Sequence, residues 1–332
     1  MKNFNLKIVF AIILTCNVWF AQKSFGQTTT AQFINNSPDT SLKSVDVWLD
    51  TVKVASKLAY GKVTSPISVV AGNHIIFITK AGDTITNYVL ATPDIIPASN
   101  NQMNILCGVK DTLKYAANPD SVSTSLSIST INNFSNASLS SFSVLFFNGA
   151  TDAPTYDVNK INSPQVKIAD NIAYSSAGNI LTLGGKSLIT ITSKDSAVFY
   201  YTYLLDATSL GGTMAVLFTS GIDTLKSANI KGAAPYSLNL AFSNGTIKKL
   251  NPVWAKYQLI QNSADLSCDT LDIYINGNKR TLGFRKATPY LNFVPYTPYT
   301  IAVANKHSTS VSSAFYTTTL VPPSEVASNK YV

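Results

Sequence analysis

Short runs of alternating or β-branched residues cover most of the chain, and turn residues separate them. In the first third of the sequence these runs fall at 31–35, 45–51, 54–59, 66–70, 74–79, 84–91 and 102–108. Sequences such as Ser-Pro-Asp and Ala-Gly-Asn between the runs supply the positive φ or Asx-turn geometry that joins strands. About seven short strands in about 110 residues are typical of an immunoglobulin-like β-sandwich. The pattern therefore predicts an all-β fold.

The same order of strands and turns occurs three times, which indicates a tandem repeat. Asp39, Asp152 and Asp265 end similar turns and lie 113 residues apart, and the strand at 45–49 matches 271–275 at twice that interval. We predict three tandem immunoglobulin-like sandwiches of about 110 residues each. Their expected boundaries are 27–140, 141–253 and 254–332, with Ser/Asn-rich linkers at 118–141 and 243–252 closing the first two.

The third repeat ends early. By the repeat interval, Val332 corresponds to position 106, in the middle of the run that closes the first repeat. The residues 329–332 resemble the opening of that strand, so we expect the third sandwich to be truncated at its C-terminus. An exposed sheet edge favours aggregation. Either the chain is a fragment, or something else completes this edge.

Residues 1–26 have the features of a secretory signal peptide. A lysine-containing start precedes the apolar stretch 8–21, and Ser24 and Gly26 place small residues three and one before the expected cleavage. Lipid anchoring at Cys16 is an alternative, although Thr15 just before it matches a lipoprotein signal poorly. After removal of the leader, no apolar run approaches the roughly 18 residues that cross a bilayer. We predict export to the periplasm, the cell surface or the medium, without a transmembrane segment.

Composition narrows the function classes. Charged residues make up 13% of the chain and hydrophobic residues 45%, which excludes a disordered protein. The formal net charge of +8 comes mainly from scattered lysines, and the only arginines are Arg280 and Arg285. Nucleic-acid-binding proteins cluster basic residues on one face or helix. Nucleic acid is therefore not an expected partner.

Several motifs resemble a known family. The turn 36–39, the strand 45–50, the Ala-Tyr-Gly turn at 59–61 and the segment 70–74 look like the exported bacterial domain of unknown function 4397. The second repeat keeps Ala173-Tyr174 and has Ser175 in place of the glycine, and the third has Leu-Gly-Phe at 282–284. The resemblance implies a secreted or cell-envelope β-sandwich module. It brings no catalytic residues with it.

Catalytic chemistry has few candidates in this sequence. Neither His74 nor His307 lies near a Ser-Gly or Cys-Gly elbow, and no CxxC or His pair has metal-ligand spacing. Cys107 and Cys268 fall in different repeats, so we expect free thiols rather than a disulfide. We predict a protein that is not an enzyme and needs no cofactor.

The recurring aspartates leave two alternatives open. Paired carboxylates can carry out glycoside hydrolysis, which would make the chain a carbohydrate-active enzyme. Carboxylate oxygens also bind calcium, which would make it a calcium-stiffened rod, with Asp39, Asp46 and Asp50 as weak candidate ligands. The simpler interpretation is that each aspartate caps its own turn.

Aromatic side chains give the binding hypothesis. Alternation in the strand 45–50 sends the three aliphatic side chains to one face and Asp46, Trp48 and Asp50 to the other. If the aliphatic face is the core, Trp48 points outward, and the same reasoning places Tyr274 outward. Exposed rings can stack on sugars or anchor protein partners. The alternative is that Trp48 covers a neighbouring strand or the next domain. We predict an adhesion, ligand-binding or spacer module whose partner is a polysaccharide or another surface protein.

Overall fold

The structure is a computed structural model that describes residues 27–98, 100–134, 141–161, 166–194, 199–222 and 234–322. In these residues the strands form separate sheets, and the helical segments are single 3₁₀ turns. The prediction of an all-β fold is therefore confirmed. The expected signal peptide with Cys16 and the expected truncated strand at 329–332 lie outside the described residues. No helix in the described part of the chain is long and apolar enough to span a membrane.

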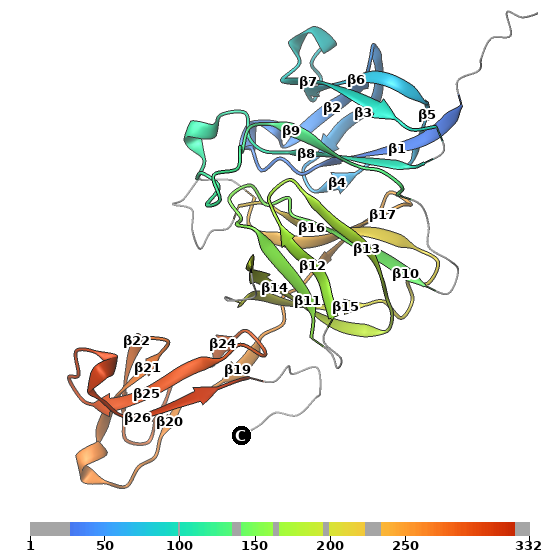
Figure 1. The fold of residues 1–332 in the computed structure, drawn as a ribbon. Coiled ribbons are helices and arrows are strands. Elements are labelled where there is room, and N and C mark those ends of the chain that lie inside the picture. Colours follow the sequence, from blue (N-terminus) through green and yellow to red (C-terminus); the bar gives the residue numbers. More distant parts are fainter. Residues whose placement is uncertain are drawn as a thin grey trace, which may run out of the picture.

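Residues 27–134, here called unit 1, form two sheets that pack face to face (Figure 1, blue to teal). The core between the sheets joins Val45, Val47 and Leu49 to Ala31 and Phe33. The first sheet has the order β4-β1-β8-β9, with β5 also pairing with β1; it comprises β1 (Thr28–Asn35), β4 (Lys62–Val63), β5 (Ile67–Val70), β8 (Gln102–Cys107) and β9 (Ser127–Ile131). The second has the order β3-β2-β6-β7 and comprises β2 (Ser44–Leu49), β3 (Val52–Ala59), β6 (Gly72–Lys80) and β7 (Leu90–Ile96).

Residues 141–250, unit 2, repeat this arrangement (Figure 1, green to yellow). Strands β1 and β8 pair in parallel with Ile34 opposite Ile105, and β10 and β16 pair in parallel with Phe147 opposite Phe218. One sheet has the order β13-β10-β16-β17-β18 and comprises β10 (Phe142–Phe147), β13 (Ala177–Leu183), β16 (Met214–Ser220), β17 (Ser237–Phe242) and β18 (Ile247–Leu250). The other has the order β12-β11-β14-β15 and comprises β11 (Tyr156–Lys160), β12 (Val166–Ile172), β14 (Lys186–Ser193) and β15 (Phe199–Asp206).

Residues 255–320, unit 3, contain one four-stranded sheet and two small two-stranded sheets (Figure 1, orange to red). The large sheet, β22-β21-β25-β26, comprises β21 (Thr270–Ile275), β22 (Asn278–Gly283), β25 (Tyr299–Asn305) and β26 (Ala314–Leu320). The small sheets pair β19 (Ala255–Tyr257) with β24 (Leu291–Phe293) and β20 (Ile260–Gln261) with β23 (Lys286–Ala287). Strands β19 and β20 together take the place of β1, since Ile260 pairs with Ala287 as Ile34 pairs with Val63. The positions equivalent to β8 begin at residue 328, outside the described residues.

The two stretches expected to be linkers contain strands instead. In the first, β9 pairs antiparallel with β8 at the edge of the unit 1 sheet. In the second, β18 pairs with β17 to form a hairpin in unit 2. Both stretches are polar because an edge strand with an exposed face does not need a continuous apolar sequence.

Units 1 and 2 pack against each other through their larger sheets. A buried cluster joins Ile34, Met103 and Ile105 of unit 1 to Phe147 and Phe218 of unit 2. Asn36 Nδ2 adds hydrogen bonds to backbone oxygens of unit 2, at 3.0 Å and 3.3 Å. The central strands β8 and β16 of these two sheets are therefore buried on both faces, one in a unit core and one in the contact between the units.

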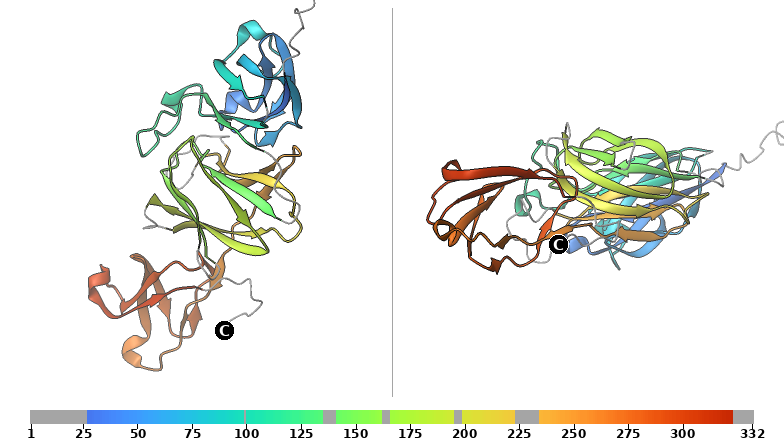
Figure 2. Two further views of the ribbon diagram at one scale, coloured as in Figure 1. Left: turned by 45° about the vertical axis from the view of Figure 1, so that its right-hand side comes forward. Right: turned by 90° about the horizontal axis from the view of Figure 1, so that it is seen from below.

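Unit 3 follows on the far side of unit 2 from unit 1, as Figure 1 and the left view of Figure 2 show. Its connection runs along β15, where Val253 N donates to Thr202 O at 2.8 Å and Pro252 bridges to Tyr203. The three units thus form a pair, units 1 and 2, followed by a third unit.

Candidate functional site

In units 1 and 3, the aspartate at the first turn caps its own backbone. Asp39 accepts hydrogen bonds from Ser41 N and Oγ, both at 2.8 Å, and from Lys110 N at 2.8 Å. Asp265 accepts the equivalent bonds from the backbone and hydroxyl of Ser267. Burial raises the pKa of Asp39, but these hydrogen bonds outweigh it and the pKa is lowered overall. Both residues begin a 3₁₀ turn, which explains their recurrence.

The second recurring aspartate is buried and tied to a lysine. Asp46 is fully buried, and its carboxylate lies 2.6 Å from Lys53 Nζ while accepting the N–H groups of Lys57 and Gly82 at 2.7 Å and 3.1 Å. Lys57 has a left-handed φ of 52° at a bulge in β3, so the carboxylate fixes that bulge. Alternation placed Asp46 correctly on the outer side of β2. The bulge and the loop after β6 then cover it.

Units 2 and 3 also have a buried, hydrogen-bonded aspartate at the equivalent position. Asp157 is fully buried and accepts from Asn171 N at 2.7 Å, where Asn171 has a φ of 51°. Asp272 has Lys279 Nζ at 2.8 Å and accepts from Thr281 and Ser308 at 2.6 Å and 2.9 Å. Burial raises the pKa of Asp272, but the hydrogen bonds with Lys279 and Thr281 and the lysine charge lower it to about 2. Asp46 and Asp272 are therefore ionised, internally paired and closed to a substrate.

Asp50 lies at a different kind of site, the exposed β2–β3 turn. Its carboxylate accepts from Ile75 N at 2.9 Å and lies 2.8 Å from His74 Nδ1, while His74 Nε2 lies 2.8 Å from Val70 O. Both ring nitrogens of His74 therefore face acceptors, which favours the doubly protonated imidazolium. Asp94 pairs opposite His74 across β6 and β7 and adds a second negative charge. Burial lowers the pKa of His74, but these acceptors outweigh it and raise the pKa overall.

This arrangement predicts a pH-dependent stability of unit 1. Because the folded-state pKa of His74 is raised, its contribution is complete below the ordinary histidine pKa of about 6.5 and disappears as pH rises through the raised value. We expect the free energy of unfolding to fall by up to about 1 kcal/mol across that window. Urea denaturation between pH 5.5 and 8.5 measures it. His74→Gln should flatten the dependence and His307→Gln should not; an unchanged slope in His74→Gln would contradict the assignment.

The three candidate calcium ligands do not form a metal site. Asp39 caps a turn, Asp46 holds a lysine and Asp50 holds a histidine. Over all the residues described, no group of three or more His, Cys, Asp or Glu side chains is arranged to hold a metal ion. A calcium ion at Asp46 would have to displace the Lys53 ammonium from a buried carboxylate.

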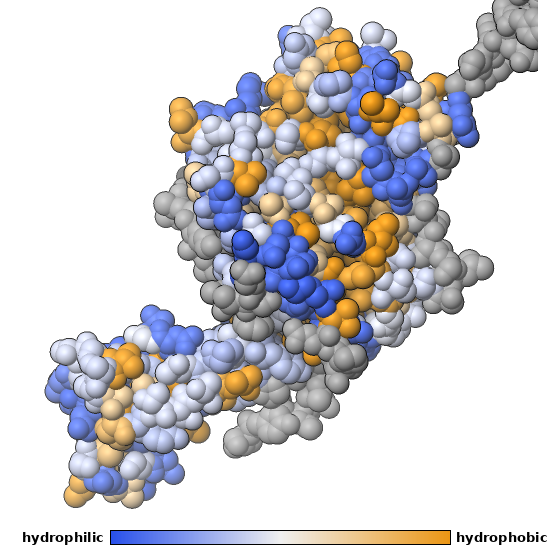
Figure 3. Space-filling model, viewed as in Figure 1, coloured by the Kyte–Doolittle hydropathy of each residue, from blue (hydrophilic) through white to orange (hydrophobic). Residues whose placement is uncertain are grey.

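Trp48 lies half-buried on the outer side of β2, within an apolar surface. Its register partner Phe77 lies on the same face and packs edge-on against Tyr88, with ring centroids 5.4 Å apart. Ile75 and Ile95 continue this face and are 44% and 70% exposed. We call Trp48, Ile75, Phe77, Tyr88 and Ile95 the outer patch. Figure 3 shows apolar groups at the surface in the region of β3, β6 and β7.

One face of the Trp48 ring is covered by a lysine. Lys53 Nζ lies 4.6 Å from the ring centroid, a cation–π contact, while the same ammonium pairs with Asp46. The indole N–H donates to Thr79 Oγ1 at 3.2 Å. The ring is therefore held in one orientation with one face covered by the lysine.

Tyr274, expected to be exposed, is buried. It is 3% exposed, and its hydroxyl lies 2.7 Å from Ser308 Oγ. Its register partner on β25 is Ala302, where unit 1 has Phe77 opposite Trp48. The small alanine leaves room for the β25–β26 connection to fold over the outer face, and Val311 from that connection packs against the cluster that Tyr274 forms with Ala302 and Ala304. Alternation gave the correct face, but the covering loop removes Tyr274 from the surface.

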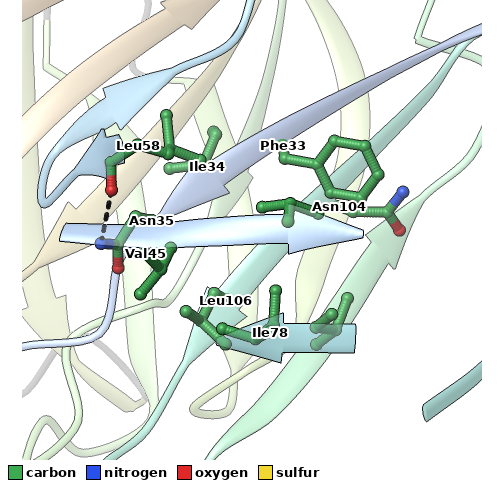
Figure 4. Close-up of a pocket in the computed structure, with 10 residues that line it drawn as sticks. Phe33, Ile34, Asn35, Val45, Leu58, Ile78, Asn104 and Leu106 are labelled. Carbon is green, nitrogen blue, oxygen red and sulfur yellow. Dashed lines mark hydrogen bonds between the residues drawn. The ribbon is translucent and has the colours of Figure 1, made fainter. Parts of the chain in front are cut away.

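A small cavity lies inside the core of unit 1, between its two sheets (Figure 4). Its free volume of about 10 Å³ is near the minimum for one water molecule. The lining is apolar except for Asn104 and Asn35, and the Asn35 amide donates to Leu58 O at 3.1 Å. This cavity is too small for a sugar or a metabolite and has no carboxylate in its lining.

Asn35 is a recurring residue that the sequence analysis did not identify. Its amide donates to the carbonyls of Leu42 and Leu58, and Asn148 donates in the same way to Pro154 and Ile172. Gln261 donates to Cys268 O at the equivalent place in unit 3. Asn148 therefore corresponds to Asn35 and not to Asn36. In every repeat the sequence has a polar amide residue at the end of an apolar strand, and this recurrence could have identified the position.

Cys107 and Cys268 are free thiols in different units. Cys107 is fully buried in the contact between units 1 and 2, and burial raises the pKa of its thiol to about 12. A thiol with this pKa stays protonated near neutral pH and is a poor nucleophile.

Searches with protein-family models and among curated proteins found no match to this chain.

Proposed function

We propose that the chain is an exported, non-catalytic binding protein that presents the outer patch of unit 1 to a protein partner. Units 2 and 3 would act as a spacer. The outer patch is the observation that carries the proposal, because Ile75, Tyr88 and Ile95 are 44%, 52% and 70% exposed on one sheet face. Contiguous exposed apolar side chains of this kind mark interaction sites.

The composition of the patch favours a protein over a polysaccharide. Sugar platforms rely on open aromatic faces, whereas the Trp48 ring carries the Lys53 ammonium on one face. Ile75 and Ile95 offer aliphatic surface, which suits an apolar side chain of a partner protein. A polysaccharide ligand is the second outcome that the experiment below distinguishes.

Export and the absence of catalysis are part of the same proposal. The signal-peptide features of residues 1–26 support export, and the resemblance to the exported domain of unknown function 4397 agrees with an envelope location. The internal pairing of Asp46 and Asp272 argues against the carbohydrate-active and calcium-dependent alternatives, since both need carboxylates that reach a ligand.

The test compares the chain 27–332 with two charge variants on an affinity support. Proteins of a bacterial envelope extract are quantified on the wild type, on Ile95→Asp and on Ile180→Asp, which changes an exposed isoleucine of unit 2. We expect a partner whose retention falls about 10-fold for Ile95→Asp, equivalent to about 1.4 kcal/mol, and is unchanged for Ile180→Asp. Equal retention on all three supports would contradict the proposal.

A polysaccharide panel completes this experiment. Binding to a glycan that Trp48→Ala abolishes in a folded protein would replace the protein partner by a carbohydrate on the same patch. Circular dichroism checks the fold of each variant. Turnover of any glycan in the panel would overturn the non-catalytic part of the proposal.

A further inference from the structure

The contact between units 1 and 2 is built from equivalent positions of the two repeats. Asn36 and Gly149 are equivalent, since Asn35 corresponds to Asn148, and Asn36 Nδ2 donates to Gly149 O at 3.0 Å. Val109 and Ile222, separated by the same 113 residues as Asn36 and Gly149, share one buried cluster. Residues that meet their own equivalents lie near a local two-fold axis. The contact therefore resembles the isologous interface of a symmetric dimer.

The tyrosines of the two Ala-Tyr turns, Tyr60 and Tyr174, each contact the other unit at equivalent places. Tyr60 of unit 1 places its hydroxyl 2.6 Å from Ser220 Oγ at the end of β16. Tyr174 of unit 2 lies beside Gly108 and Cys107 at the end of β8. Burial raises the pKa of Tyr60 to about 12, as expected of a ring enclosed between two units. Each unit thus offers the other the same self-complementary surface.

Unit 3 keeps the local structure of β1, which forms one part of this surface in unit 1. Gln32 Nε2 donates to Thr64 O at 3.0 Å, and Gln258 Nε2 donates to Thr288 O at 3.0 Å. The threonine hydroxyls accept from the next backbone N–H in both units, at 3.0 Å and 3.1 Å. The path from β19 to β20 therefore follows β1 residue by residue, with Ile260 in the place of Ile34 and Asn262 in the place of Asn36.

The same positions have opposite exposure in the two units. Ile34 is 1% exposed because unit 2 covers it, whereas Ile260 is 65% exposed. Asn36 is fully buried and Asn262 is exposed. Phe284, in the place of Tyr60, is half-buried, with the Arg285 guanidinium 5.0 Å from its ring centroid. Unit 3 therefore keeps an apolar residue and an amide of the pairing surface and exposes both.

We propose that the surface of unit 3 that carries Ile260, Asn262 and Phe284 packs against the same surface of a second copy of this chain, forming a two-fold dimer. A second copy is the partner because the unit 1–unit 2 contact shows that two units of this repeat pack through this surface in a self-complementary way. At the axis, Asn262 of each copy would lie against Asn262 of the other, as Asn36 lies against Gly149. Two asparagine amides can exchange hydrogen bonds there.

Nearby charge predicts the salt dependence of this dimer. Arg285 and Lys286 are exposed beside the pairing residues and would approach their copies in the partner. Like charges repel over about 8 Å at physiological ionic strength. Added salt should therefore strengthen the dimer.

Sedimentation equilibrium of the chain 27–332 tests the proposal. We expect reversible dimerisation that Ile260→Lys weakens at least 10-fold, while Ile180→Lys, which changes an isoleucine of unit 2 that is 46% exposed, leaves it unchanged. A wild-type chain that stays monomeric up to about 100 μM overturns the proposal. Equal dimerisation of Ile260→Lys also overturns it.

Cross-linking places the axis independently. In a Cys268→Ser background, Asn262→Cys should give a disulfide-linked dimer on mild oxidation, because the two cysteines would face each other. Asn87→Cys, in an exposed loop of unit 1, is the control for random collisions. Equal rates for the two variants would contradict a contact at Asn262.

Discussion

Asp46→Ala should lower the free energy of unfolding of unit 1 by about 3–5 kcal/mol, the range for removing one partner of a buried ion pair. The substitution leaves Lys53 beside an apolar space and removes the acceptor of two backbone N–H groups, Lys57 N and Gly82 N. The bulge at Lys57, with its φ of 52°, loses the contact that fixes it. A buried donor without an acceptor costs about 1–3 kcal/mol, so the two backbone groups alone account for much of the loss.

Urea denaturation of the chain 27–332 followed by tryptophan fluorescence measures this effect. Trp48 is next to the site and reports on unit 1, while Trp254, just before unit 3, contributes in the same way to the signal of every variant. Asp83→Ala is the matched control, because Asp83 is a less buried carboxylate in the same loop, and it should change stability by less than about 0.5 kcal/mol. A loss below about 1 kcal/mol in Asp46→Ala would show that the recurring aspartate is not structural.

The sequence predicted which strand side chains point to the core, but not which of the outward side chains are covered by loops. Alternation in β2 correctly assigned Val45, Val47 and Leu49 to the core. It could not show that Asp46, on the opposite face, is covered by the bulge in β3 and the loop after β6. Coverage by a loop depends on how the connection folds back, and strand periodicity contains no information about that.

Tyr274 shows the same limit. Its outward direction followed from alternation, yet whether it is exposed depends on the size of its neighbour across the strand pair. Ala302 allows the following connection to pack on the tyrosine, while Phe77 at the equivalent place keeps Trp48 in an open apolar surface. Predicting this requires the strand register, which only the assembled sheet provides.

The contact between units 1 and 2 did have a signal in the sequence. Every residue of β8 and of β16 is buried, and each strand contains an apolar run without alternation, at 105–107 in β8 and at 214–218 in β16. Such runs are typical of strands that are covered on both faces. A sheet at the surface of an isolated sandwich would alternate, so these runs already indicated a second layer on the outer side.

Phe218→Ala should destabilise the pair of units 1 and 2 by about 3–5 kcal/mol, the cost of emptying a fully buried phenylalanine site. Phe218 packs in the cluster between the units with Phe147 and Ile34, so the cavity opens in the contact rather than in either sandwich core. In the wild type we expect the two units to unfold in a single calorimetric transition, because neither can expose this cluster alone. In Phe218→Ala the transition should separate into two or move to lower temperature as a whole. Phe315→Ala, at a ring of unit 3 that is 57% exposed, is the control. If Phe218→Ala unfolded like that control, the cluster would not couple the units.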